Sequence, residues 1–139
     1  MISVGEPAPD FTLPDQGGQE VSLSDFKGQR VLLVFYPLDF SPVCSDQLTL
    51  YRDIAPQLKE AGVTPLGISV DSAFAHKAFQ DHLGIDTTLL ADFEPKGAVA
   101  SAYGAYLDGA GHSNRSLVLI DAEGRIITFK WDQVPATFR

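Results

Sequence analysis

The sequence predicts an α/β fold built on a mixed β-sheet. Two nearly continuous apolar runs, Val31–Tyr36 and Thr64–Val70, are typical of central strands that are covered on both faces. Apolar residues at helical spacing lie between them, and a strand–helix–strand unit makes its two strands parallel with a right-handed crossover. Two more strands are predicted at Ser116–Ile120 and Ile126–Trp131. The turn residues of Asp121–Gly124 separate them, so they form a hairpin at the C-terminal end of the sheet.

Residues 1–30 are rich in turn-forming residues and predict a second hairpin. Phe11–Leu13 and Glu20–Leu23 have the pattern of short strands, and Pro14–Gly18 between them has the composition of a turn. Ser24–Gly28 is typical of a single helical turn that ends at glycine. We therefore expect an N-terminal β-hairpin in addition to the main sheet.

Two helices are predicted on either side of the second central strand. The first begins at Cys44 and ends near Glu60, and Pro56 inside it is expected to kink or break it. The second is capped by Ser72 and ends at Leu83, because Gly84 stops it. Its inner face is predicted to carry four apolar side chains: Phe74, Ala78, Phe79 and Leu83.

The remaining segments are short. Thr87–Leu90 is predicted to be extended, Pro95–Tyr103 to be a helix that ends at Gly104, and Gly109–Gly111 to be a loop. Together these elements predict a thioredoxin-like α/β fold, in which a mixed sheet is flanked by helices and an N-terminal β-hairpin is added. We expect residues 1–139 to form one domain.

The composition is that of a soluble globular protein. Apolar residues make up 45% of the chain and charged residues 20%. The net charge of −8 argues against nucleic acid or an anionic membrane as a partner, and solubility explains it more simply. The longest apolar run is too short to span a bilayer, and the N-terminus lacks the features of a signal peptide, so a cytoplasmic location is expected.

Cysteine and histidine usage limits the chemistry. Cys44 is the only cysteine, which excludes a disulfide within these 139 residues, a Cys-x-x-Cys redox motif and a multi-cysteine zinc site. His76, His82 and His112 show no metal-ligand spacing, and we interpret them as surface residues. Neither a metal nor another cofactor is expected.

Cys44 is the candidate nucleophile. If Ser41 is the N-cap of the predicted helix, Pro42 occupies the first helical position and Cys44 the third. The sulfur then lies among unpaired backbone N–H groups at the positive end of the helix dipole, which favours the reactive thiolate. The Ser41 hydroxyl is one turn away, and Pro37 and Pro42 restrict the loop and shield the pocket from water.

A reactive thiolate usually has a cation nearby, and Arg115 is the candidate. It directly precedes the strand Ser116–Ile120. If that strand runs antiparallel to Val31–Tyr36, its first residues lie beside the Cys44 end of the central strand. The alternative is that Arg115 is a solvated loop arginine.

The pattern Pro37-x-x-x-Ser41-x-x-Cys44 resembles the active-site signature of peroxiredoxins. The resemblance covers most of the chain. It includes VGEPAPDFTLPDQ near the N-terminus, DFKGQRVLLVFYPLDFSPVC before the cysteine, AYGAY, and NRSLVLIDAEGRI, which places Arg115 on the family's active-site arginine. Within the family, the sequence is most similar to the single-cysteine, AhpE-like and bacterioferritin-comigratory groups.

This resemblance implies a thiol-dependent peroxidase whose substrate is hydrogen peroxide or an organic hydroperoxide. Cys44 would attack the peroxide and become a sulfenic acid. Arg115, Ser41 and backbone N–H groups would orient the peroxide and stabilise developing charge, while Pro37 shields the sulfur. Thr49 stands where some relatives have a resolving cysteine, so an external thiol or a thioredoxin- or glutaredoxin-like protein is expected to recycle the enzyme.

The resemblance also implies a homodimer formed through loops around the active site. The family's C-terminal helix is expected to be absent, because the chain stops near where it would begin. Two alternatives remain at this stage. One is a redox-inactive thioredoxin-like binding module in which Cys44 is a packing residue. The other, less favoured, is a thiol–disulfide reductase, which would normally have a cysteine at the position of Ser41.

Overall fold

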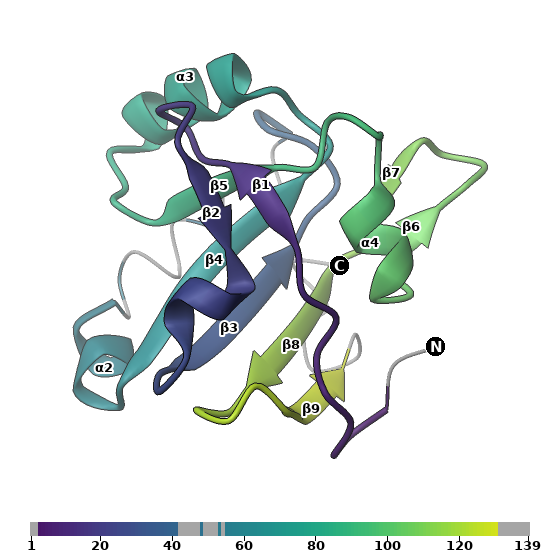
Figure 1. The fold of residues 1–139 in the computed structure, drawn as a ribbon. Coiled ribbons are helices and arrows are strands. Elements are labelled where there is room, and N and C mark those ends of the chain that lie inside the picture. Colours follow the sequence, from purple (N-terminus) through teal and green to yellow (C-terminus); the bar gives the residue numbers. More distant parts are fainter. Residues whose placement is uncertain (1–2, 42–47, 49–52, 54, 131–139) are drawn as a thin grey trace.

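A five-stranded mixed sheet forms the centre of the molecule in the computed structural model, which describes residues 3–41, 48, 53 and 55–130. The strand order is β5-β4-β3-β8-β9 (Figure 1). The strands are β3 (Arg30–Phe35), β4 (Val63–Ser69), β5 (Thr88–Ala91), β8 (Ser116–Ile120) and β9 (Ile126–Lys130). Because β3 pairs in parallel with β4 and antiparallel with β8, the predicted α/β fold with a mixed sheet is confirmed.

The N-terminal hairpin is also confirmed. Strands β1 (Thr12–Pro14) and β2 (Glu20–Ser22) pair antiparallel, and the single helical turn that follows is the 3-10 helix η1 (Leu23–Phe26). The hairpin lies over one face of the main sheet (Figure 1). Its apolar side chains, with Phe11 just before it, belong to the core on that face.

The helix α3 (Ala73–Leu83) has the predicted ends but not the predicted inner face. The Ser72 hydroxyl accepts a hydrogen bond from the backbone N–H of Ala75, and Gly84 adopts the left-handed conformation that ends the helix. Phe74 is 89% exposed and Ala78 is also exposed, so their predicted place on the inner face is wrong.

His76 is fully buried on the inner face of α3, and its interpretation as a surface residue is wrong. It is spaced by three and seven residues from Phe79 and Leu83, which do face inward. The physical reason is that the chain after β3 presents a buried carboxylate, Asp39, to this position of the helix. A polar pair therefore occupies a place where an apolar side chain was expected.

The helices near the predicted first crossover and after β5 differ in length from the predictions. Leu48 and Asp53 are helical, and the helix α2 spans Ala55–Glu60. Pro56 lies in the first turn of α2. The predicted helix start at Cys44 lies outside the described residues. The helix α4 (Ala98–Ala102) is shorter than Pro95–Tyr103, because Gly97 before it has a left-handed backbone. None of the helices that the structure describes is both long and apolar enough to cross a membrane.

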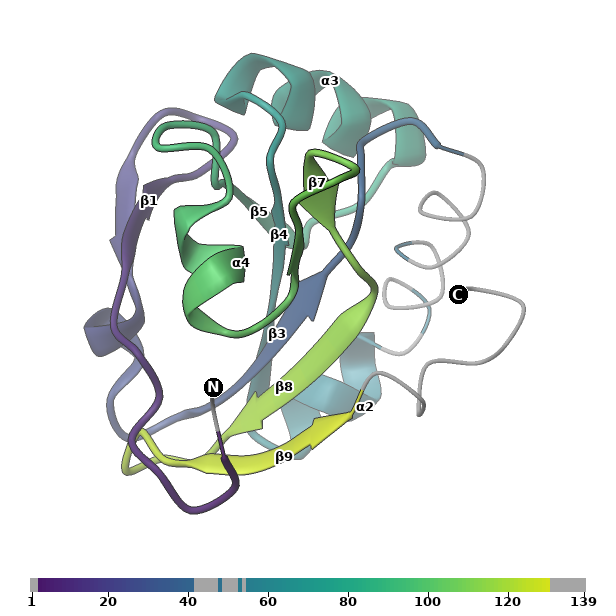
Figure 2. The ribbon, with the colours of Figure 1, turned by 90° about the vertical axis from the view of Figure 1, so that its right-hand side faces the viewer.

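A small hairpin was not predicted. Strands β6 (Tyr106–Leu107) and β7 (His112–Ser113) pair antiparallel on either side of the predicted loop at Gly109–Gly111. The hairpin lies next to α4 (Figures 1 and 2).

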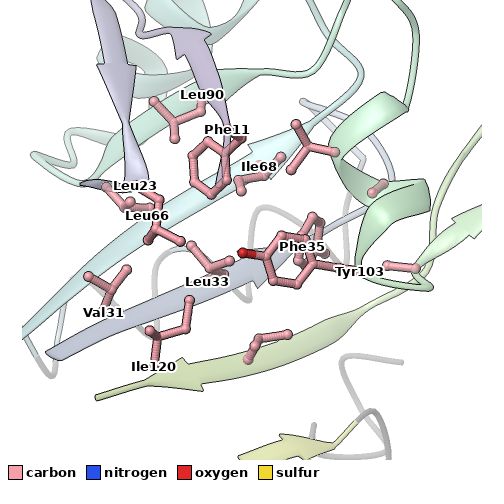
Figure 3. Packing of buried hydrophobic residues seen from close by; sticks show 14 of the residues in the cluster. Phe11, Leu23, Val31, Leu33, Phe35, Leu66, Ile68, Leu90, Tyr103 and Ile120 are labelled. Atoms are coloured by element: carbon pink, nitrogen blue, oxygen red, sulfur yellow. The ribbon is translucent and has the colours of Figure 1, made fainter. Parts of the chain in front are cut away.

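Two hydrophobic clusters cover the two faces of β3, because alternate residues of a strand point to opposite sides. Val31, Leu33 and Phe35 belong to the cluster formed with the N-terminal hairpin and α4 (Figure 3). Val34 and Tyr36 belong to the other cluster, which contains Phe79 of α3. Figure 2 shows α4 on one side of the sheet and α2 on the other. Packing on both faces of the sheet therefore fixes the carboxyl end of β3, where the candidate site begins.

Candidate active site

The candidate site lies at the carboxyl end of β3, beside the carboxyl end of the parallel strand β4. This edge is where open α/β sheets usually bind ligands. Tyr36 continues the pairing by donating its backbone N–H to the carbonyl of Ile68 at 3.2 Å. Pro37 follows and is half-buried, and the chain then turns at Asp39 and Phe40. The predicted site residues therefore start on rigid structure.

Ser41 ends this turn. It is partly buried, and its hydroxyl donates a hydrogen bond to the carbonyl oxygen of Leu38 at 3.1 Å. Its predicted role as the N-cap of a helix that contains Cys44 falls on residues 42–47, which lie outside the described part of the chain. Cys44 itself is in that segment, so its role as nucleophile stays a prediction.

The strand direction that the Arg115 prediction requires is confirmed. β8 is antiparallel to β3, with Ser116 opposite Phe35, so Arg115 stands beside the residue that follows the strand. The Ser113 hydroxyl donates to the carbonyl of Tyr36 at 2.9 Å, which ties the same segment to the start of the loop. Arg115 is half-buried, and the structure brings it to the end of the sheet that leads to Cys44.

A buried polar network behind the loop was not predicted. The Tyr36 hydroxyl donates to Oδ1 of Asp39 at 2.6 Å, and Nδ1 of His76 lies 2.8 Å from Oδ2 of the same carboxylate. The Nε2 of His76 donates to the carbonyl of Leu90 at 2.9 Å. Burial, and then the Asp39 carboxylate, raise the pKa of Tyr36 well above its usual value, so its hydroxyl stays protonated as a donor.

The network continues along the backbone of the loop. The N–H of Asp39 donates to Oδ2 of Asp71 at 2.8 Å, and the Ser69 hydroxyl donates to the same oxygen at 2.6 Å. Ser69 is the last residue of β4. The signal that could have found His76 is its spacing from Phe79 and Leu83, which marks it as inward-facing on α3.

The described residues contain no group of side chains that could hold a metal ion. Among them, no three His, Cys, Asp or Glu side chains gather as a metal ion would require. A cavity of about 700 Å³ lies at the opposite end of the strands, where Gln29 precedes β3 and Val63 and Thr88 begin β4 and β5. None of the predicted site residues lines it.

The sequence is similar to that of a known protein family over most of its length. The sequence model of the AhpC/TSA family matches residues 4–129. Alkyl hydroperoxide reductase E of Mycobacterium tuberculosis (strain H37Rv) is 41% identical over 140 residues, covering 100% of this chain and 91% of that protein. A putative peroxiredoxin bcp of Coxiella burnetii is 41% identical over 139 residues, covering 96% of this chain and 90% of that protein.

Solved structures agree with these sequences. The peroxidoxin BcpB of Mycobacterium tuberculosis has a TM-score of 0.85 and 29% identity, covering 94% of this chain and 86% of that one. The reduced 2-Cys peroxiredoxin of Plasmodium vivax has a TM-score of 0.82 and 33% identity, covering 91% of this chain and 83% of that one.

Proposed function

Because the chain belongs to the AhpC/TSA family of peroxiredoxins, we propose that it is a thiol-dependent peroxidase that reduces hydroperoxides with Cys44. Its fold is the thioredoxin-like fold of its solved relatives. The alternative of a redox-inactive binding module is not favoured, because the relatives are named as peroxiredoxins and an alkyl hydroperoxide reductase.

One observation carries the proposal. The antiparallel pairing of β3 and β8 brings Arg115 to the end of β3 that continues through Pro37 and Ser41 to Cys44. Pro37, Ser41 and Cys44 lie on one segment and Arg115 lies far away in the sequence, and the register supports the meeting of the two segments at one edge of the sheet. A thiolate, a guanidinium and a hydroxyl are the groups that reduction of a peroxide needs.

The reaction is a two-electron oxidation of sulfur. The Cys44 thiolate attacks one peroxide oxygen, an S–O bond forms and the O–O bond breaks. The second oxygen leaves with the electron pair, takes up a proton and departs as water or an alcohol. Arg115 and the Ser41 hydroxyl stabilise the negative charge that develops on the oxygens, and Pro37 limits access of water to the resulting sulfenic acid.

Recycling requires a reductant from outside these 139 residues, because they contain no second cysteine. A thiol attacks the sulfenic acid, water leaves and a mixed disulfide forms. A second thiolate then attacks that disulfide and releases Cys44 as a thiolate. A small thiol or a thioredoxin- or glutaredoxin-like protein supplies both sulfur atoms.

Self-association is part of the proposal. Leu38 and Phe40 are apolar side chains in the turn before Ser41, yet 41% and 49% of their surface is exposed. Such side chains beside an active site are suited to an interface between two copies of the chain. Sedimentation velocity should give a mass twice the 15.0 kDa of one chain, and a single monomeric species at all concentrations would contradict the dimer.

The test of the proposed function is the variant Cys44→Ser. It should fold like the parent and consume hydrogen peroxide no faster than buffer, because a hydroxyl is a far weaker nucleophile than a thiolate. Peroxide consumption is measured with excess dithiothreitol as reductant. Ser101→Ala, at an exposed position on α4, is the matched control and should keep the parent rate. Consumption of hydrogen peroxide by Cys44→Ser at the parent rate would contradict the proposal.

A further inference from the structure

We propose that His76 is a positioning residue for the peroxide reaction, because its buried pair with Asp39 holds the turn Asp39–Ser41 from which the Cys44 segment departs. This inference rests on the proposed function and adds a residue to it. The hydrogen bonds of the His76 ring to Asp39 and Leu90 give it a route to the loop through Asp39.

The His76 ring is held by both of its nitrogens. The Leu90 carbonyl only accepts hydrogen bonds, so Nε2 carries a proton and donates it at 2.9 Å. On the other side a single proton lies between Nδ1 and Oδ2 of Asp39, which are 2.8 Å apart. The side chains of His76 and Asp39 are 0% and 1% exposed, so water does not replace either bond. The ring therefore links β5 to the loop after β3.

Asp39 makes two further hydrogen bonds besides this one. Its Oδ1 accepts from the Tyr36 hydroxyl, and its backbone N–H donates to Asp71, which Ser69 also holds. The carboxylate is thus connected to β3 and α3, and the backbone to the end of β4. A buried group with so many partners has one allowed position, because moving it breaks several hydrogen bonds at once.

Phe40, the residue after Asp39, has a strained backbone that the hydrogen bonds of Asp39 help to hold in place. Phe40 has φ of +67°, in the left-handed region that disfavours all residues except glycine. Its ring packs on Phe79 at 4.9 Å and on His82 at 5.6 Å between ring centroids. Both partners belong to α3, the helix that carries His76. The helix thus holds the strained turn at two consecutive residues.

Release of Asp39 would let this turn relax. Ser41 follows Phe40 directly, and its hydroxyl is bonded back to Leu38 within the same turn. A relaxed turn moves Ser41, and the chain that continues from it to Cys44, relative to Arg115, which directly precedes β8. Misplacement of reacting groups by about 1 Å can cost roughly a hundredfold in rate.

Two amide substitutions separate the two hydrogen bonds of His76. The amide nitrogen of asparagine takes the place of Nδ1 and keeps the bond to Asp39, whereas that of glutamine takes the place of Nε2 and keeps the bond to Leu90. We expect His76→Asn to react with hydrogen peroxide within severalfold of the parent and His76→Gln to be slower by roughly a hundredfold. Lys77→Ala, an exposed neighbour on α3, is the control and should keep the parent rate.

Alkylation of Cys44 and the variant Asp71→Ala provide two further tests of the role of His76. Alkylation of Cys44 by iodoacetamide needs no peroxide, so it tests the loop even if the proposed function fails, and it should show the same order of rates. If the His76 variants do not fold, Asp71→Ala removes the acceptor of the Asp39 N–H at a half-buried position and should slow both reactions. Parent-like rates in folded His76→Gln, or in Asp71→Ala where the His76 variants do not fold, would overturn the inference.

Discussion

Arg115 illustrates how a residue reaches a site through pairing rather than through its own neighbours. The hydrophobic pattern around it does not distinguish an arginine at the candidate site from a solvated loop arginine. The strand register gives its location, because Ser116 stands opposite Phe35 and Arg115 therefore lies beside the end of β3. The hydrogen bond from Ser113 to the Tyr36 carbonyl holds the segment there.

Replacing this arginine should therefore affect rate and not fold. Arg115→Ala should lower the rate constant for sulfenic acid formation by about 10²- to 10³-fold, the usual cost of removing one donor that stabilises developing oxyanion charge. The rate is measured by stopped-flow fluorescence or by competition for hydrogen peroxide. Arg125→Ala removes an exposed arginine in the β8–β9 turn and should leave the rate unchanged. Equal rates for the parent and Arg115→Ala would remove Arg115 from the mechanism.

The location of Arg115 beside the end of β3 could be predicted from the sequence, whereas the burial of His76 could not, for one physical reason. The location of Arg115 depends on the pairing of two strands, and each of these strands is recognisable as a hydrophobic run. The partner of His76 is Asp39, and this contact depends on how a loop folds over the end of α3. Local spacing shows that position 76 faces inward, but it does not show that the carboxylate of Asp39 lies beside it.

At the scale of elements, the ends of α3 follow from local chemistry, whereas those of α4 do not. Ser72 and Gly84 act as predicted because caps are local hydrogen-bonding devices. The predicted helix Pro95–Tyr103 is shortened to Ala98–Ala102 because Gly97 has φ of +72°. The buried carboxylate of Asp92 takes over as acceptor for the N–H groups of Val99 and Ala100.

Gly97 and Gly104 form a matched pair for testing this helix. Both have φ of +72°, but a Cβ at Gly97 would overlap the Tyr106 ring, while one at Gly104 would meet nothing. Gly104→Ala should lower the free energy of unfolding by about 1 to 2 kcal/mol through backbone strain. Gly97→Ala should cost a further 1 to 3 kcal/mol, roughly the cost of overpacking. Urea denaturation measures both, and equal losses would show that Tyr106 moves freely aside.

For the whole molecule, the central strands were predictable because each is a hydrophobic run bounded by turns, whereas the place of β5 in the sheet was not predicted. The β6–β7 hairpin escaped prediction because strands of two residues carry no periodicity. The packing on both faces of β3 was expected from its continuous apolar run, and the structure places a separate cluster on each face.

The free energy of unfolding should depend on the ionisation of Asp92 at acidic pH. Burial raises the pKa of this carboxyl above its ordinary value of 3.8, although hydrogen bonds from Ala100 and Val99 oppose the shift. A raised pKa in the fold means that the stabilising contribution is present below pH 3.8 and is lost as pH rises through the folded value.

The comparison with Asp92→Asn isolates this contribution, because asparagine does not titrate. The free energy of unfolding of the parent minus that of the variant should fall as the pH is raised from below 3.8 through the acidic range. Urea denaturation of both proteins in matched buffers gives the difference at each pH. A difference that grows with pH would show that the ionised carboxylate is the favoured form in the fold.

The central claim is that the chain reduces peroxides through a sulfenic acid on Cys44, and direct trapping tests it. The reduced protein is treated with one equivalent of hydrogen peroxide in the presence of dimedone, digested and examined by mass spectrometry. We expect one dimedone adduct, located on Cys44, and its loss when peroxide is omitted. An unmodified Cys44, with no adduct and no more highly oxidised sulfur, would contradict it.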